Sequence, residues 1–166
     1  MKVKIFDLEF DREFYYIQRE KIVDKVSFNN RTLYSKFEKI DKLPTPLLIK
    51  QHLGGELVVA LPLIQNNSID YIVLEYERED SNSFFYLIKH LLKSLQIELF
   101  YTYESNKKNF IQIFIPVVDL TVERVYSQVE KIKRMLELKS SKRCKILPNK
   151  NLPIKYNKIT LPAKKM

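Results

Sequence analysis

The stretch ELVVALPLIQNNSIDYIVLEYE, residues 56–77, decides the fold class. It contains two β-rich runs, residues 56–64 and residues 70–77. Such runs, bounded by turn residues, are typical of strands, and the segment QNNS between them is a hairpin signal. We therefore predict a β-hairpin over residues 56–77.

Helices alternate with hairpins after this stretch. Residues 83–95 place their apolar side chains on one helical face, with Ser81 as a possible cap. Residues 98–117 read as a second hairpin around the turn SNKKN, and a long helix follows over residues 120–138. The apolar stripe of that helix consists of Val122, Val125, Val129, Ile132 and Leu136. This order predicts an α+β fold, an antiparallel sheet of two hairpins with both of these helices packed on one face.

The segments before residue 56 are less regular. Residues 3–10 look like a strand, residues 11–25 fit a helix or a strand, and residues 28–37 read as a loop with a short element. The short helix within residues 45–55 is well marked, because Thr45 can cap it, Pro46 can begin it and Gly54 can take the left-handed position at its end. In the loop-rich tail we expect a short strand at residues 158–161.

Length and composition limit the classes of protein. A chain of 166 residues is expected to form a single domain, with residues 1–44 as an N-terminal strand and helix extension and residues 45–166 as the core. Two glycines are too few for a Gly-rich phosphate loop, and one cysteine allows no intrachain disulfide. No apolar run approaches the roughly 20 residues of a membrane span. We expect a cytoplasmic protein that does not bind membranes.

The net charge of +9 is unevenly distributed. Residues 131–166 hold twelve Lys or Arg and one acid, whereas the first 130 residues are slightly acidic. Such a basic block suits a polyanion such as DNA or RNA, and the alternative is a solvated lysine-rich surface. The candidate nucleic-acid-binding residues are Lys107, Lys108, Arg124, Lys131, Arg134, Lys142, Arg143 and Lys145. Tyr101 and Tyr103 are candidates for base stacking, although their alternation also fits ordinary strand packing.

Glu75 and Glu77 are the candidate metal ligands. Side chains two apart on a strand share a face, roughly 6.5 Å apart along it. Paired carboxylates of this kind can hold a divalent cation, and we expect weak binding of Mg²⁺ or Mn²⁺ at most. The alternative is that the pair only solvates the end of a strand, since Glu79 and Asp80 continue the acidic run.

Several motifs in residues 45–162 occur in a recognisable order. HLGG (52–55) precedes VVALPLI (58–64), and Glu75-Tyr76-Glu77 ends the next strand. The helix SFFYLIKHLLKSLQI, the strands ELFYTYES and NFIQIFIPV, and a second helix come next. ILPNKNLP (146–153) and ITLP (159–162) complete the series. In this order the chain resembles the archaeo-eukaryotic primase and primase-polymerase superfamily, most closely the primase domain that accompanies helicase and nuclease modules in mobile-element conflict systems.

The resemblance implies an RRM-like primase core and a connection to nucleic acids. The family's metal-binding aspartates correspond to Glu75 and Glu77, its nucleotide-binding histidine falls at Phe110, and the nearest position to a third acid is around Cys144. Its glycine-rich turn is SNKKN here, without a glycine. Because nucleotidyl transfer needs exact metal placement, we expect a degenerate site and assign no catalytic residue. The alternatives are a protein-interaction domain without nucleic-acid binding and a divergent metal-dependent nucleotidyltransferase.

Overall fold

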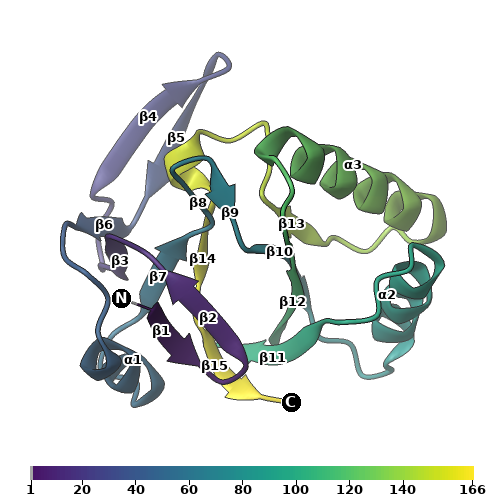
Figure 1. Cartoon of the computed structure of the whole chain (residues 1–166), viewed down its shortest axis with the longest axis horizontal. Coiled ribbons are helices and arrows are strands. Elements are labelled where there is room, and N and C mark those ends of the chain that lie inside the picture. Colours follow the sequence, from purple (N-terminus) through teal and green to yellow (C-terminus); the bar gives the residue numbers. More distant parts are fainter. Residues whose placement is uncertain (1) are drawn as a thin grey trace.

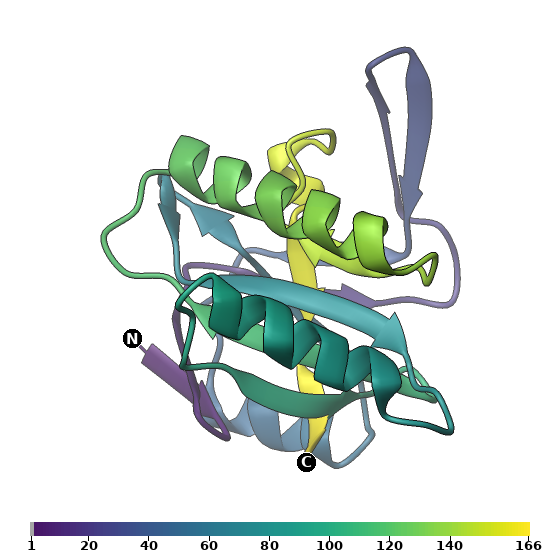
Figure 2. The same ribbon diagram turned by 90° about the vertical axis from the view of Figure 1, so that its right-hand side faces the viewer.

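A five-stranded antiparallel sheet forms the centre of the protein, whose computed structural model describes residues 2–166 (Figure 1). Its order is β13 (Lys145–Leu147), β10 (Tyr71–Glu77), β12 (Phe110–Pro116), β11 (Tyr101–Ser105), β15 (Pro162–Lys165). The helices α2 (Ser83–Ser94) and α3 (Val122–Lys139) lie together on one face of this sheet (Figure 2). The predicted α+β class is confirmed, with both helices on one face.

The elements from β10 to β13 follow the order β-α-β-β-α-β. The first strand, β10, lies between the fourth and the third, and the second strand, β11, pairs only with β12 within this unit. This is the ferredoxin-like or split βαβ arrangement. The predicted hairpin over residues 98–117 is the β11–β12 pair. Strand β15 extends the sheet beyond β11.

The side chains between this sheet and the helices follow from strand and helix periodicity. Ile72, Leu74 and Tyr76 alternate along β10 and face the helices. Helix α3 buries four members of its predicted stripe, Val125, Val129, Ile132 and Leu136. Val122, the fifth, packs against this core while partly exposed. The sequence therefore predicted this layer correctly.

A second layer covers the opposite face of the central sheet. Tyr71, Val73 and Phe114 point into it and meet side chains from the N-terminal segment. The layer contains the hairpin of β1 (Lys2–Ile5) and β2 (Leu8–Asp11), the helix α1 (Pro46–Leu53) and a four-stranded sheet. Residues 2–44, expected as an extension, thus contribute to the same core as the later strands.

The four-stranded sheet corrects the prediction of a hairpin over residues 56–77. Its order is β14 (Lys158–Thr160), β7 (Val59–Pro62), β3 (Tyr15–Gln18), β6 (Phe37–Ile40). Strand β7 is buried along its whole length, as suits a central strand, and pairs with β3 and β14 and not with β10. The QNNS turn closes only the small hairpin of β8 (Ile64–Gln65) and β9 (Ser68–Ile69).

The ends of two helices differ in detail from expectation. At α1, the side chain of Thr45 accepts a hydrogen bond from the Leu48 amide and Pro46 begins the helix, as predicted. Gly54, however, stays right-handed at φ −79°, and the left-handed residue is Gly55 at φ +79°. Helix α2 is preceded by Asn82 and not by Ser81, and the Asn82 side chain makes no capping hydrogen bond.

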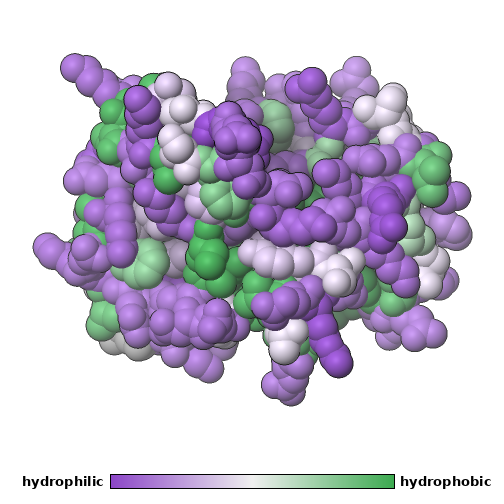
Figure 3. All heavy atoms as spheres, turned by 90° about the horizontal axis from the view of Figure 1, so that it is seen from above, coloured by the Kyte–Doolittle hydropathy of each residue, from purple (hydrophilic) through white to green (hydrophobic). Residues whose placement is uncertain are grey.

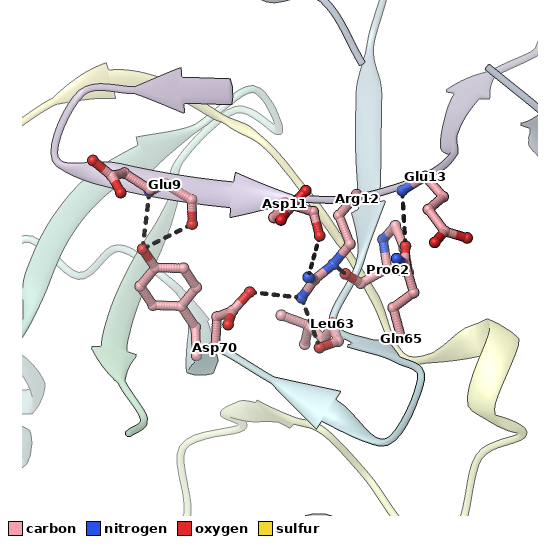
Figure 4. A network of polar contacts seen from close by, with 9 residues as sticks. Glu9, Asp11, Arg12, Glu13, Pro62, Leu63, Gln65 and Asp70 are labelled. Atoms are coloured by element: carbon pink, nitrogen blue, oxygen red, sulfur yellow. Dashed lines mark hydrogen bonds and ion pairs between the residues drawn. The ribbon is translucent and has the colours of Figure 1, made fainter. Parts of the chain in front are cut away.

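Arg12 joins the N-terminal hairpin to the start of β10 (Figure 4). Its side chain is 3% exposed. The guanidinium donates to the carbonyl oxygens of Pro62 at 2.7 Å and Leu63 at 3.1 Å, and it pairs with the Asp70 carboxylate at 2.9 Å. Because a buried guanidinium must have its donors satisfied, this network fixes the relative position of β2, β7 and β10.

A long hairpin of β4 (Asp24–Phe28) and β5 (Arg31–Ser35) projects from the molecule (Figure 1). The sequence predicts a loop with a short element over residues 28–37, and most of this segment is instead the turn and the second strand of the hairpin. Asn29 and Asn30 occupy its turn with φ of +51° and +61°, as a tight hairpin turn requires. The 3₁₀ helix η1 (Ile154–Tyr156) lies beside it, where the Tyr156 hydroxyl donates to the Leu33 carbonyl at 3.3 Å. None of the helices in residues 2–166 has the length and apolar character required to cross a membrane.

Candidate nucleic-acid interface

One end of the central sheet gathers several of the predicted site residues. Strand β10 ends with Glu75 and Glu77, which share the sheet face opposite the helices with Val73. The antiparallel register places Glu77 opposite Phe110 and Glu75 opposite Lys145. The turn with Lys107 and Lys108 and the loop with Lys142 and Arg143 therefore lie at this same end.

Glu75 is held by a buried amide. Gln112 Nε2 donates to Glu75 Oε2 at 3.1 Å and to the Thr160 carbonyl at 2.9 Å. The Gln112 side chain thereby joins the central sheet to β14. Its Oε1 atom is buried and has no hydrogen-bond partner among the described residues. Glu75 is thus oriented by the fold, whereas Glu77 is exposed.

The remaining positions that the resemblance singles out carry no further metal ligand. Phe110 lies under the Lys107 ammonium, with Nζ 4.0 Å from the ring centroid. Burial raises the pKa of the Cys144 thiol to about 12, so that it stays protonated at neutral pH. In residues 2–166 no three side chains of His, Cys, Asp or Glu come together as a metal site. Glu75 and Glu77 remain a predicted pair without a third protein ligand.

A groove runs between the end of α3 and β13. Its volume is about 540 Å³. The basic residues that line it are Lys133, Lys142, Arg143 and Lys145, and Glu137 is the one acid in its lining. Lys142 is also paired with Glu79 at 3.4 Å, which holds the loop after α3 against the loop before α2. Lys133, Arg143 and Lys145 have no ion-pair partner among residues 2–166, and these three bases against one acid make the groove electropositive. We call it the α3–β13 groove.

A second hollow, the inter-sheet cleft, adjoins this groove at Lys145. It lies between the four-stranded sheet, hairpin β4–β5 and the end of β10, and its volume is also about 540 Å³. Lys36, Lys145 and Lys158 line it, together with the aromatic side chains of Tyr34, Phe37 and Tyr156. Glu75 is the one carboxylate in its lining. The cleft thus combines positive charge with aromatic surfaces.

Strand alternation explains why Lys158 faces this cleft. Val59, Leu61 and Ile159 point into the core, so their neighbours Ala60, Lys158 and Thr160 point outward. The Lys158 ammonium lies 4.4 Å from the ring centroid of Tyr156, 5.1 Å from that of Tyr16 and 5.7 Å from that of Phe37. Burial, and next the charge of Lys145, lower the pKa of Lys158 to about 8.

Three predicted binding residues lie elsewhere. Arg124, Lys131 and Arg134 are exposed on the face of α3 opposite its buried stripe. Lys133 and Glu137, which line the α3–β13 groove, come from the flank of the helix between these two faces. Figure 3 views the molecule from the side of α3 and hairpin β4–β5, and this surface is mainly hydrophilic, with small apolar areas between charged side chains.

Tyr103 cannot stack bases, contrary to that prediction. Its ring is fully buried, stacked on Phe6 at 5.4 Å, and its hydroxyl donates to Asp7 at 3.0 Å. Tyr101 is half-buried against the same core. RRM domains stack bases on the open face of their sheet. Here that face is covered by the second layer, which we call the N-terminal layer because residues 2–62 supply all of its elements except β14.

Sequence reasoning singled out Glu75 and Lys145 but missed the other charged and aromatic residues of the inter-sheet cleft. Lys36, Phe37, Tyr156 and Lys158 are distant along the chain, and they line one cleft because β6, β7 and β14 belong to the same sheet and η1 directly precedes β14. The Asn29–Asn30 pair is a signal for hairpin β4–β5, equal to the Asn66–Asn67 pair within the QNNS turn.

The comparison with known protein families concerns the N-terminal part of the chain. A family model described as a domain of unknown function (DUF1882) matches residues 1–70. No curated protein matches the chain. The matched residues end before β10, so they include hairpin β4–β5 and β7 but none of the β-α-β-β-α-β unit.

Proposed function

We propose that this protein is a catalytically degenerate, primase-like domain that binds nucleic acid through phosphate contacts in the α3–β13 groove. The observation that carries the proposal is the position of Lys145. This residue lines both the groove and the inter-sheet cleft, so the basic side chains of the two hollows form one track. A flexible polyanion can follow such a track.

A single strand suits this surface better than a duplex. Aromatic side chains accompany the lysines in the inter-sheet cleft. Single-strand binding combines a basic groove with aromatic rings on which bases stack. The ferredoxin-like order of β10 to β13, with Glu75 in the lining of the inter-sheet cleft and Glu77 two residues further along β10, supports the primase-like part of the proposal.

The test is fluorescence anisotropy with single-stranded and duplex oligonucleotides at two salt concentrations. Replacing Lys133, Arg143 and Lys145 with alanine removes three charges from the groove. Binding to a single strand should weaken for every sequence, and the slope of log K against log salt should flatten by about 2. The matched control replaces Arg124, Lys131 and Arg134, which removes the same charge from the outer face of α3.

The two triple variants separate the possible outcomes. A larger loss with the groove variant supports the proposal. Equal losses would show that binding follows net charge alone, and the groove would then have no special role. If the unmodified protein does not bind at low salt, the protein is not a nucleic-acid-binding domain and the protein-interaction alternative takes its place.

A further inference from the structure

Lys158 has an unusual environment for a lysine. Its ammonium is enclosed by three aromatic rings, and no carboxylate of the described residues lies within 4.0 Å of it. Aromatic faces attract a cation but do not accept strong hydrogen bonds, so the three N–H donors remain available for a ligand. A half-buried ammonium of this kind is costly to maintain, and an anion in the cleft would compensate for it.

The charges around Lys158 favour an anion with more than one negative charge. Lys36 and Lys145 line the same cleft, and Glu75 faces them. Asp24, on β4, is already paired with Lys155 at 3.1 Å. Lys36, Lys145 and Lys158 against Glu75 therefore leave an excess of two positive charges in the cleft, which a phosphate monoester carrying −1.5 to −2 near neutral pH would balance.

The size and walls of the cleft indicate what carries that phosphate. A volume of about 540 Å³ lies within the range of small-molecule sites. Tyr34, on hairpin β4–β5, is 58% exposed at the cleft and offers a ring on which a base can stack. A ligand whose phosphate contacts Lys158 and whose base stacks on Tyr34 is a mononucleotide unit.

We propose that the inter-sheet cleft is a binding site for a phosphate monoester on a nucleotide, with Lys158 as its principal phosphate contact. This inference rests on the proposed function where the nucleotide is the phosphorylated end of a strand whose remainder follows the α3–β13 groove. A free nucleoside monophosphate carries the same chemistry and is the other possible source. The phosphate lies on the Lys158 side of the cleft, away from the Glu75 carboxylate.

The pH dependence of phosphate binding tests the role of Lys158. The groups that face Lys158 are Lys145, Asp24, Lys155, Glu75, Lys36 and the phenols of Tyr16 and Tyr156. Burial raises the pKa of the Tyr16 phenol to about 12 and also raises that of Tyr156. Since Lys158 loses its proton near pH 8, its contribution to binding should decrease as the pH rises through that value.

The decisive experiment compares oligonucleotides that differ only in a 5′-phosphate, a 3′-phosphate or a hydroxyl end. One of the phosphorylated ends should bind roughly tenfold more tightly than the hydroxyl end, as expected for one charge-assisted contact. Lys158→Gln should remove this preference, so that the phosphorylated and the hydroxyl ends bind with affinities that agree within about twofold. Lys150→Gln is the matched control, since it removes one charge from an exposed position of the same segment.

A second measurement distinguishes the cleft site from the proposed binding of a nucleic-acid strand. Calorimetry with a nucleoside monophosphate and with inorganic phosphate tests the cleft without any strand. Binding that Lys158→Gln abolishes, in a protein that binds no oligonucleotide, would support the cleft site and overturn only the proposed function. Equal binding of all strand ends together with no binding of the monophosphate would overturn the inference. A phosphate preference that survives in Lys158→Gln would also overturn it.

Discussion

At the scale of single residues, His52 is a structural side chain in the last turn of α1. It is 5% exposed. Its Nδ1 accepts a hydrogen bond from the Val59 amide at 3.0 Å, so its Nε2 carries the proton and faces the carbonyls of Leu161 and Pro162 at 3.0 and 3.1 Å. The neutral ring thereby joins α1, β7 and the segment after β14, and burial lowers the pKa of His52 below its ordinary value of 6.5.

Stability should consequently depend on pH through His52. Below about pH 6.5 the unfolded chain takes up a proton that the folded chain does not, so the free energy of unfolding should fall on acidification by up to about 1.4 kcal/mol per pH unit. Urea unfolding at pH 7.5 and pH 5.5 would measure this. His52→Gln should reduce the difference between the two pH values, whereas His90→Gln, at an exposed site, should not. Equal differences in all three proteins would contradict the assignment.

Glu75 and Glu77 should bind Mn²⁺ or Mg²⁺ weakly. Two carboxylates, one of them held by Gln112, leave most of a six-ligand shell to water. Calorimetry should therefore detect no binding of Mn²⁺ at micromolar concentrations, and Glu75→Gln should change nothing in that range. Tight binding that is lost in Glu75→Gln would instead favour the nucleotidyltransferase alternative.

At the scale of elements, periodicity predicted the features that depend on residues close together in the sequence. The stripes of α2 and α3 and the N-terminal cap of α1 were predicted correctly because each depends on residues within one or two turns. Strand partners were not predicted correctly, because a buried apolar strand such as β7 can lie in any sheet and its sequence pattern does not indicate which strands pair with it. The same limit applies to the site. Glu75 could be predicted from the pattern of its own strand. Lys158 could not, because the aromatic rings around it come from β3, β6 and η1.

Hairpin β4–β5 should be dispensable for folding and important for binding. None of its residues belongs to either core cluster. Asp24 and Ser35 are register partners, so an Asn-Gly turn can replace residues 25–34. The free energy of unfolding should fall by no more than about 2 kcal/mol, for the lost hydrogen bonds of Arg31 and Tyr156.

Binding should respond more strongly to the shortened hairpin. Loss of Tyr34 removes one stacking ring, and affinity for a single strand should drop roughly tenfold. Anisotropy with Tyr34→Ala as the comparison would show whether the ring accounts for the effect. A shortened protein that unfolds in water, or one that binds like the full chain, would contradict this assignment of the hairpin.

At the scale of the whole molecule, the two layers are interleaved along the chain. The residues matched by the family model supply β3, β6 and β7, but the fourth strand of their sheet is β14, from residues 158–160. The central sheet likewise receives its edge strand β15 from residues 162–165. Leu161, between these two strands, is fully buried in the core shared with Val3 and Leu48.

This interleaving has a consequence during synthesis on the ribosome. The apolar face of the N-terminal layer emerges first and cannot be fully covered until residues 158–165 have left the exit tunnel. The nascent chain must therefore carry an incomplete sheet, with the edge of β7 open, through most of its translation. A chain released early would retain that open edge, and an aggregation-prone fragment is the expected product of any premature stop before β14.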